Sequence, residues 1–399
     1  MPLVSFPMAV LVAAACASSP AAPIDLQPQV RGNSAFCFEM YQQLRVREGN
    51  LFFSPCSIST ALAMTYGGAR GETEAEMAAV LHLSGEQEAV HGTFSRLQSQ
   101  LNAIQDKGDV QLSIANSLWA QQNYSFLDAF LDLTKSHYGA GVRFVDFAGN
   151  TEAARLEINT WVEEQTKEKI KDLIKQGMLE PSTALVLCNA IYFKGNWLSQ
   201  FEKARTRETD FISTPEKTIQ VPMMNQSTNV KFRRFDGFSA IELPYAGNDL
   251  SMVVFLPEQQ DGLAGFEDQL KQEAITGWLE DLANTSPSEV SISLPKFKVT
   301  CEFELSSVLA EMGMSHAFSD ADFSGMTGRK DLFISKVVHK AFVDVNEEGT
   351  EAAAATAVIM DKSFSRPLTF RADHPFMFLI RENTTGSVLF VGRIADPTK

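Results

Sequence analysis

The residues that could carry out chemistry are few, and their spacing does not match a known reaction centre. The chain contains no GxSxG, HExxH, GxxxxGK[ST] or GxGxxG pattern, and its cysteines include no CxxC pair. We therefore expect no metal site, no cofactor and no enzymatic activity, although a Ser/His/Asp triad assembles from distant positions and spacing alone does not test for one. The candidate groups are His82, His91, His137, His316, His339 and His374, with Cys16, Cys37, Cys56, Cys188 and Cys301.

The charge balance restricts the possible partners. The 399 residues include 34 Lys and Arg against 49 Asp and Glu, a formal net charge of −15. We therefore expect no binding to nucleic acid or to an anionic membrane surface, because both are themselves negative. Residues 87–104 form a predicted helix with Arg96 as its one cation, so no heparin-type site is evident. Beyond the N-terminus no run of about 18 apolar residues occurs, so we expect no transmembrane segment.

Residues 1–23 differ from the rest of the chain. Val4 to Ala17 is apolar and uncharged and is followed by small residues, which is typical of a cleaved secretory signal peptide, although no Lys or Arg precedes it. The AAAC sequence that ends at Cys16 also resembles a bacterial lipoprotein box, which would leave Cys16 lipidated. We predict a secreted, extracellular protein, with a bacterial envelope lipoprotein and a misassigned start codon as the alternatives.

Hydrophobic periodicity divides the chain into a helix-rich first half and a strand-rich second half. This segregation favours an α+β fold over alternating βαβ units. Pro55 stands at a first helical position, and Thr73 begins a capping-box spacing. Helical spacing occurs at 33–48, 55–66, 73–83, 87–104, 125–138 and 151–174. Strand patterns occur at 110–120, 185–193, 239–245, 250–256, 290–301, 332–345, 376–381 and 387–392, and the continuously apolar run 185–193 predicts a buried central strand.

Residues 346–369 fit neither pattern, although they lie between two predicted strands. Tested as a strand, the segment places the small side chains of Thr350, Ala352 and Ala354 on one face and Glu351 on the other. It offers little apolar surface, so it can equally stand as an exposed loop. A segment compatible with two states is what a conformational switch requires. An alanine-rich helix without a special role is the alternative.

Several short motifs distributed along the chain are specific for one protein family. They are NLFFSP at 50–55 with Ser57, NAIYFKG at 189–195 with Trp197, ELPY at 242–245 followed by LSM at 250–252, DHPF at 373–376, and VGR at 391–393 with Pro397. From about Asn33 to Pro397 the chain resembles the serpins, the serine protease inhibitor superfamily. The resemblance implies a serpin fold with three β-sheets, about eight or nine helices and an exposed reactive centre loop. Residues 24–399 would form a single serpin domain, expected to be a monomer, with the loop at about 346–369.

The resemblance also implies a pseudo-substrate mechanism. A serine protease attacks the loop and forms an acyl-enzyme, and insertion of the cut loop into the main sheet traps the protease in a covalent complex. Such a suicide inhibitor is consumed and is not an enzyme. A non-inhibitory serpin that acts as a carrier or chaperone is the alternative, but the small residues in the first half of the loop favour the inhibitor.

The family's functional positions carry over onto this sequence residue by residue. The hinge of the loop corresponds to Glu347, Glu348, Gly349, Thr350, Glu351, Ala352, Ala353, Ala354 and Ala355. The shutter, a hydrogen-bonded polar cluster beneath the sheet opening, corresponds to Ser54, Ser57, Asn189 and His339. The breach, where insertion begins, corresponds to Trp197 and to the salt bridge between Lys296 and Glu347.

The position of the scissile bond follows from counting along the loop. In the family, the residue before this bond lies about sixteen positions after the hinge glutamate, which gives Ser363 followed by Phe364. The span from Glu347 to Phe370 is about one residue shorter than usual, so Lys362 is the alternative. Ser363 would favour elastase-like or subtilisin-like proteases, whereas Lys362 would favour trypsin-like proteases, whose pocket selects a cation.

Overall fold

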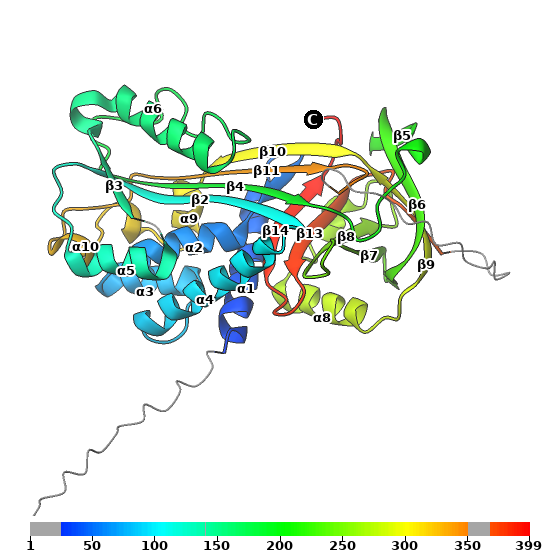
Figure 1. Ribbon diagram of the computed structural model, residues 1–399, viewed down its shortest axis with the longest axis horizontal. Helices are drawn as coiled ribbons and strands as arrows, with labels where there is room; N and C mark the ends of the chain where they lie inside the picture. Colours follow the sequence, from blue (N-terminus) through cyan, green and yellow to red (C-terminus); the bar gives the residue numbers. More distant parts are fainter. Residues whose placement is uncertain (1–24, 140, 350–367) are drawn as a thin grey trace, which may run out of the picture.

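The computed structural model describes residues 25–139, 141–349 and 368–399. A five-stranded sheet and a nine-stranded sheet system form the body of the protein (Figure 1). Helices α1 to α5 lie on one side of the five-stranded sheet, and α6 covers its other face. No described helix combines the length and the apolar character needed to cross a bilayer. The helices are thus concentrated around one sheet, as an α+β fold requires.

The five-stranded sheet has the strand order β10–β11–β4–β2–β3. Its strands are β2 Val110–Gln121, β3 Val142–Val145, β4 Leu185–Gly195, β10 Phe297–Glu304 and β11 Lys336–Val345. The central strand β4 is buried along almost its whole length, as its continuous apolar run predicts. It lies antiparallel to β2 but parallel to β11, in a register that runs from Lys336 opposite Val186 to Val343 opposite Phe193.

The nine-stranded system consists of two sheets that share the long strand β6. One end of β6 pairs with β5 and β9, and its other end pairs with β7. With the five-stranded sheet this gives the expected three-sheet α+β architecture. The expected strand 290–301 is divided at Lys296 into β9 and β10, which belong to different sheets. The bounds are β1 Leu51–Phe53, β5 Arg207–Thr214, β6 Lys217–Phe235, β7 Phe238–Pro244, β8 Leu250–Pro257, β9 Ser288–Pro295, β12 Leu368–Arg371, β13 Phe376–Glu382 and β14 Val388–Ile394.

The described residues contain ten α-helices, which is close to the expected number because α7 and α10 are only five and four residues long. Their bounds are α1 Gln27–Leu44, α2 Pro55–Tyr66, α3 Gly71–Val80, α4 Gln87–Asp106, α5 Asp128–Tyr138, α6 Phe147–Gln165, α7 Leu263–Glu267, α8 Gln272–Ala283, α9 Ser306–Glu311 and α10 Ser324–Thr327.

Several helix boundaries differ from the sequence prediction, and the helix predicted at 33–48 is α1, which begins at Gln27 and ends at Leu44. The expected capping box at Thr73 is wrong, because α3 begins at Gly71 and the Thr73 hydroxyl accepts the amide N–H of Asp322. The expected helix 151–174 ends early, at Gln165. Lys167 and Glu168 beyond it have φ of +51° and +60°, and such left-handed conformations interrupt a right-handed helix.

The described cysteines are free thiols, and Cys37, Cys56 and Cys188 are buried. The apolar residues that flank these three in the sequence predict this outcome. Burial raises the pKa of the Cys56 thiol to about 11 and that of Cys37 well above its usual value. The thiolate is the reactive form, so these cysteines are structural rather than chemical groups.

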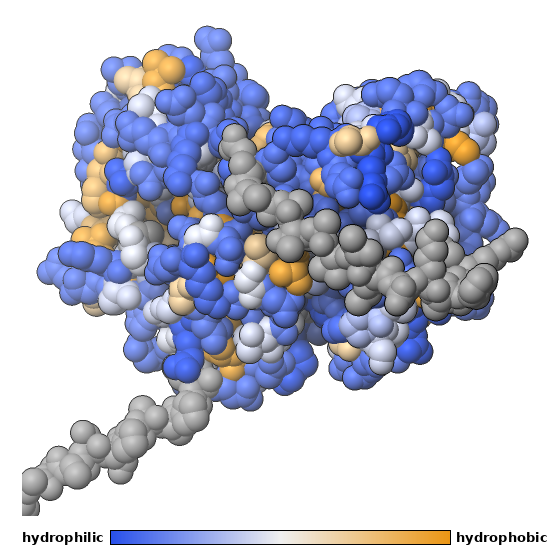
Figure 2. All heavy atoms as spheres, turned by 45° about the vertical axis from the view of Figure 1, so that its right-hand side comes forward, coloured by the Kyte–Doolittle hydropathy of each residue, from blue (hydrophilic) through white to orange (hydrophobic). Residues whose placement is uncertain are grey.

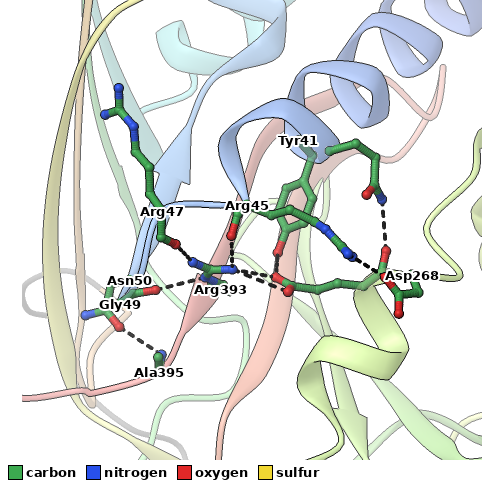
Figure 3. A network of polar contacts seen from close by, with 10 residues as sticks. Tyr41, Arg45, Arg47, Gly49, Asn50, Asp268, Arg393 and Ala395 are labelled. Atoms are coloured by element: carbon green, nitrogen blue, oxygen red, sulfur yellow. Dashed lines mark hydrogen bonds and ion pairs between the residues drawn. The ribbon is translucent and has the colours of Figure 1, made fainter. Parts of the chain in front are cut away.

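A buried ionic network connects the last strand, β14, to the first helix, α1 (Figure 3). Arg393 on β14 pairs with Glu267, with Nη1 at 3.0 Å from Oε1, and donates to the backbone carbonyls of Arg45 and Gly49. Tyr41 on α1 donates its hydroxyl to the same carboxylate at 2.5 Å, and burial together with Glu267 raises the pKa of this tyrosine well above its usual range. Loss of one partner would leave an uncompensated buried charge, so the network ties the two ends of the domain together.

The surface is mostly hydrophilic, as Figure 2 shows for one face. The large apolar side chains that remain exposed come from separate loops and elements, namely Val46, Leu127, Phe144, Leu156, Leu198 and Leu368. Apolar residues scattered in this way are ordinary on protein surfaces and need no partner to explain them.

Candidate functional site

A row of polar side chains crosses the centre of the five-stranded sheet. Asn189 on β4 lies opposite His339 on β11 and opposite Asn116 on β2. His339 Nδ1 is hydrogen bonded to Asn189 Oδ1, and Asn189 Nδ2 donates to Asn116 Oδ1. Asn189 is 1% exposed and His339 is 0% exposed. A buried polar row of this kind is satisfied only while the three strands remain paired.

The N-terminus of α2 completes this polar cluster. The Ser54 N–H donates to His339 Nε2 at 3.2 Å, and the Ser54 hydroxyl donates to the Leu389 carbonyl at 2.7 Å. Asn189 Nδ2 donates to the hydroxyl of Ser57 at 2.6 Å and to its carbonyl at 3.0 Å. Ser54 is the N-cap of α2, and its Oγ accepts the Ser57 N–H. The fold therefore brings together Ser54, Ser57, Asn189 and His339.

The hydrogen bonds determine the tautomer of His339. Because Nε2 accepts the Ser54 amide, the proton of the neutral ring lies on Nδ1, which donates to Asn189. Complete burial lowers the pKa of His339 to about 3, and the hydrogen bond with Asn189 opposes this only in part. The ring is therefore neutral throughout the physiological range.

Acidification is expected to destabilise the protein through His339. Between about pH 6.5 and about pH 3 the unfolded state binds a proton that the native ring does not, so the free energy of unfolding falls as the pH falls, by up to about 1.4 kcal/mol per pH unit. His91, with a pKa lowered by burial to about 4, acts in the same direction. Urea unfolding between pH 7.5 and pH 5.0 should therefore show a steeper loss for the wild type than for His339→Gln. Equal slopes would contradict the assignment of a neutral His339.

Glu347 anchors the chain directly after β11. Its carboxylate pairs with Lys296 Nζ at 2.8 Å and accepts the Thr206 hydroxyl at 2.8 Å. Burial acts to raise the pKa of Glu347, but these hydrogen bonds outweigh burial and hold the pKa below its usual value. The next residue, Glu348, pairs with Lys203. Because Lys296 lies between β9 and β10, the Glu347 pair fixes the end of β11 to the point where the chain passes between sheets.

A tight turn holds residues 346–349 against Trp197. The Trp197 indole N–H donates to the Asn346 carbonyl at 3.0 Å, and its backbone N–H donates to the Glu348 carbonyl at 3.1 Å. The indole stacks on Tyr245 with a centroid distance of 4.6 Å. Gly349 has φ of +90°, and a Cβ at this position would collide with the backbone of residues 195–197. Only glycine fits this turn, and Gly349 is the last described residue before position 368.

The other predicted site residues lie outside the described residues. They are Thr350, Glu351, Ala352, Ala353, Ala354 and Ala355 of the hinge, and Lys362, Ser363 and Phe364 at the scissile bond. Within the three described ranges, no cluster of three or more His, Cys, Asp or Glu side chains could hold a metal ion.

Sequence reasoning missed three residues that contact the predicted ones, namely Asn116, Thr206 and Lys203. Asn116 could have been found, because it is a polar residue in the middle of a mainly apolar strand pattern. Thr206 and Lys203 precede β5 in a segment without periodicity, and no local signal marks them.

Comparison with known proteins identifies relatives of this chain and the family to which it belongs. The chain is 42% identical over 372 residues to leukocyte elastase inhibitor of Xenopus laevis, covering 91% of this chain and 97% of the relative. It is also 42% identical over 386 residues to human serpin B3, covering 92% and 98%. The class that these relatives represent is that of the protein inhibitors of proteases. The family model described as Serpin (serine protease inhibitor) matches residues 31–397, and the chain belongs to the serpin family.

The fold also occurs in a protein that binds a small molecule. Human thyroxine-binding globulin, solved in complex with thyroxine, superimposes with a TM-score of 0.85 at 32% identity, covering 94% of this chain and all of that one. The fold alone therefore does not separate an inhibitor from a carrier, and the distinction depends on the site and its loop.

The predicted location outside the cell is wrong. The relatives named leukocyte elastase inhibitor, serpin B3 and serpin B4 are clade B serpins, which lack signal peptides and are intracellular. The apolar run in residues 1–23, on which the prediction of a secreted or envelope protein depended, lies outside the described residues. The missing basic residue before that run was the sign that this signal was weak.

Proposed function

We propose that this protein is a suicide inhibitor of serine proteases, which it traps as an acyl-enzyme by inserting its cut loop into the five-stranded sheet. The observation that carries the proposal is the direct parallel pairing of β4 and β11. The segment 350–367 follows β11 through the turn at Gly349, so a strand formed from it between β4 and β11 would run antiparallel to both. Insertion would thus exchange one parallel pairing for two antiparallel ones, which are slightly more stable per residue.

The contacts of the described residues support a sheet that can open at this place. A new strand between β4 and β11 must break the hydrogen bond between His339 and Asn189, because these residues face each other across that pair. The opening would start at the turn near Trp197, where the Lys296 to Glu347 pair holds the end of β11. The polar cluster and the anchored turn are therefore proposed to keep the sheet closed until the loop is cut.

The small residues at the start of the loop support insertion from the sequence side. Thr350, Ala352 and Ala354 would share one face of the new strand, and none is charged or large. Gly349 and the pairs formed by Glu347 and Glu348 would act as the hinge. Ala353 and Ala355 would lie on the opposite face with Glu351.

The chemistry of trapping belongs to the protease. Its serine Oγ would attack the carbonyl carbon of Ser363, the bond to the Phe364 nitrogen would break, and the Phe364 amine would leave with a proton. The ester that remains is the covalent complex. Cleavage one residue earlier, after Lys362, is the alternative, and it would direct the inhibitor to trypsin-like rather than elastase-like or subtilisin-like proteases.

The test is incubation of the purified protein with trypsin, elastase and subtilisin, followed by a denaturing gel and the mass of the released C-terminal peptide. A stable complex of the summed masses is expected with at least one protease, and a peptide that begins at Phe364 or Ser363 identifies the bond. Cleavage by all three without any complex, and without a rise in the Tm of the cut protein, would contradict the proposal. That result would favour a carrier or chaperone.

A further inference from the structure

The strand β12 begins where the described chain resumes, and its own packing holds it only weakly. It has four residues, Leu368–Arg371, and lies at an edge of its sheet, where β9 is its partner among the described strands. Phe370 is the one buried side chain of β12, and its ring meets that of Phe232 edge to face at 6.4 Å. A short edge strand with a single buried side chain opens readily, so the position of β12 depends on the residues that follow it.

The two residues Asp373 and His374 attach the end of β12 to two other strands. The Asp373 carbonyl accepts the N–H of Ile212 on β5 at 2.8 Å. His374 is 6% exposed, and its Nε2 lies 2.8 Å from the carbonyl oxygen of Pro257, the last residue of β8. His374 therefore links the chain after β12 to the end of β8.

Both ring nitrogens of His374 face hydrogen-bond acceptors. Nδ1 lies 2.9 Å from Asp373 Oδ1, and Nε2 faces the Pro257 carbonyl oxygen. Neither a carboxylate nor a carbonyl oxygen can donate a hydrogen bond, so each ring nitrogen must carry a proton. A neutral imidazole carries only one, and the two contacts are satisfied together only by the imidazolium cation.

The carboxylate of Asp373 lies between two cations. Its Oδ2 pairs with Arg371 Nε at 2.7 Å. Burial acts to raise the pKa of Asp373, but the hydrogen bonds from His374 and Arg371 outweigh burial and hold the pKa below its usual value. The carboxylate is therefore ionised at neutral pH and cannot supply the second proton. The nearest ionisable residues along the chain on the two strands that the anchor contacts are both exposed, namely Glu258 after β8 and Asp210 on β5.

We propose that His374 is a positioning residue, which in its imidazolium form holds the strand that follows the reactive loop and which releases this strand as the pH rises. After the ring loses a proton, it can donate to Asp373 or to Pro257 but not to both. The end of β12 is then held by fewer contacts, and β12 separates from β9 more often.

The anchor has a consequence for inhibition, and this consequence rests on the proposed function. In a chain whose loop inserts into the five-stranded sheet after cutting, β12 keeps the far end of the uncut loop at β9. Release of β12 removes this restraint and permits an uncut loop to enter the sheet, which would consume the inhibitor without a protease. The inhibitory activity should therefore be lost faster at higher pH.

Hydrogen exchange followed by mass spectrometry measures the anchor in the full chain without any protease. Exchange of the β12 amides is compared at pH 6.0 and pH 8.0 after correction for the intrinsic exchange rates. We expect the protection of wild-type β12 to be about tenfold lower at pH 8.0, the effect of losing one charge-assisted hydrogen bond. His374→Gln should show low protection at both pH values. His374→Arg, which keeps a cation with several donors, should show high protection at both.

The matched control is His316→Gln, which removes a histidine from another histidine–carboxylate pair. His316 Nδ1 lies 2.6 Å from Oε1 of Glu76, which is on α3. This variant should keep the pH dependence of β12, and an equal loss of pH dependence in His316→Gln and His374→Gln would overturn the proposal. Wild-type protection that is the same at both pH values, or a pH dependence that survives in His374→Gln, also overturns it. Circular dichroism checks the folding of each variant.

The half-life of inhibitory activity at the two pH values tests the consequence separately. It should be shorter at pH 8.0 for the wild type and independent of pH for His374→Arg. If β12 responds to pH as expected but no protease is trapped at any pH, the anchor stands and the proposed function fails. If proteases are trapped and the half-life does not follow the protection of β12, the coupling between the anchor and loop insertion is refuted.

Discussion

Replacing Ala354 by arginine is expected to turn the proposed inhibitor into a substrate that the protease cuts and releases. In an inserted strand, Ala354 would point to the same face as Thr350 and Ala352, into a space that suits small residues. A guanidinium group buried there without a partner costs several kcal/mol. Insertion would then be slower than hydrolysis of the acyl-enzyme, and the yield of trapped complex should fall by at least about tenfold, since 1.4 kcal/mol is already a factor of ten.

The matched control for this variant is Ala355→Arg, which adds the same group one residue later, on the face that would point to solvent. This variant should trap the protease that the wild type traps. Denaturing gels give the ratio of complex to cut inhibitor, and thermal unfolding of the cut forms gives the consequence for the sheet. The Tm should rise after cutting for the wild type and for Ala355→Arg but not for Ala354→Arg. Equal trapping by both variants would contradict the alternation on which the inserted strand is based.

The best sequence predictions concern elements that local physical chemistry determines. The start of α2 follows from Pro55, which occupies the predicted first helical position, and the structure adds Ser54 as the N-cap. The central strand β4 follows from an apolar run that only burial on both faces explains. In each case the signal lies within a few residues of the boundary it predicts.

The prediction of strands from the sequence fails where the hydrophobic pattern is weak or misleading. Strand β5 has a single fully buried residue, Phe211, so it lacks the alternation that would reveal a strand. The pattern at 290–301 continues through Lys296, and only Pro295 indicates that one apparent strand is two. Periodicity reports the burial of each residue but not the sheet in which it is buried.

The spacing of residues along the sequence could not have shown which residues form the polar cluster. Asn189 and His339 are 150 positions apart in the sequence, and Ser54 and His339 are 285 apart. A lone polar residue in a strand is usually a satisfied local group, so only the family resemblance indicated that these residues meet. The structure adds Asn116, and with it the observation that the cluster spans three adjacent strands rather than one pair.

Replacing Asn189 by alanine is expected to lower the free energy of unfolding by about 3 kcal/mol or more. The substitution leaves the buried His339 Nδ1–H without its acceptor, and it removes the donor to the Ser57 hydroxyl and to Asn116 Oδ1. Each orphaned buried polar group costs about 1–3 kcal/mol. Urea unfolding at pH 7.5 measures the loss, and Asn123→Ala, at an exposed turn residue, is the matched control. A difference of less than about 0.5 kcal/mol between the two variants would show that the cluster does not stabilise the sheet.

The double variant Asn189→Ala and His339→Ala then measures the coupling between β4 and β11. If the hydrogen bond between the two side chains is the main contact of each, the partner of the second residue is already lost in the single variant. The second substitution should then lower the free energy of unfolding much less than the same substitution does in the wild type. Additive losses would instead assign the stability to the separate contacts with Ser54 and Ser57.

The same weakening should lower the barrier to opening of the sheet, which connects the stability of the cluster to the proposed function. In Asn189→Ala, β4 and β11 would separate more often and expose strand edges that an intact loop, from the same or another molecule, could fill. Incubation at a temperature a few degrees below the Tm of the variant should therefore produce oligomers or an inactive monomer on a native gel, before any protease is added. The variant could instead keep full inhibitory activity after such incubation, although its free energy of unfolding in urea is lowered. The polar cluster would then stabilise the domain without controlling entry of the loop.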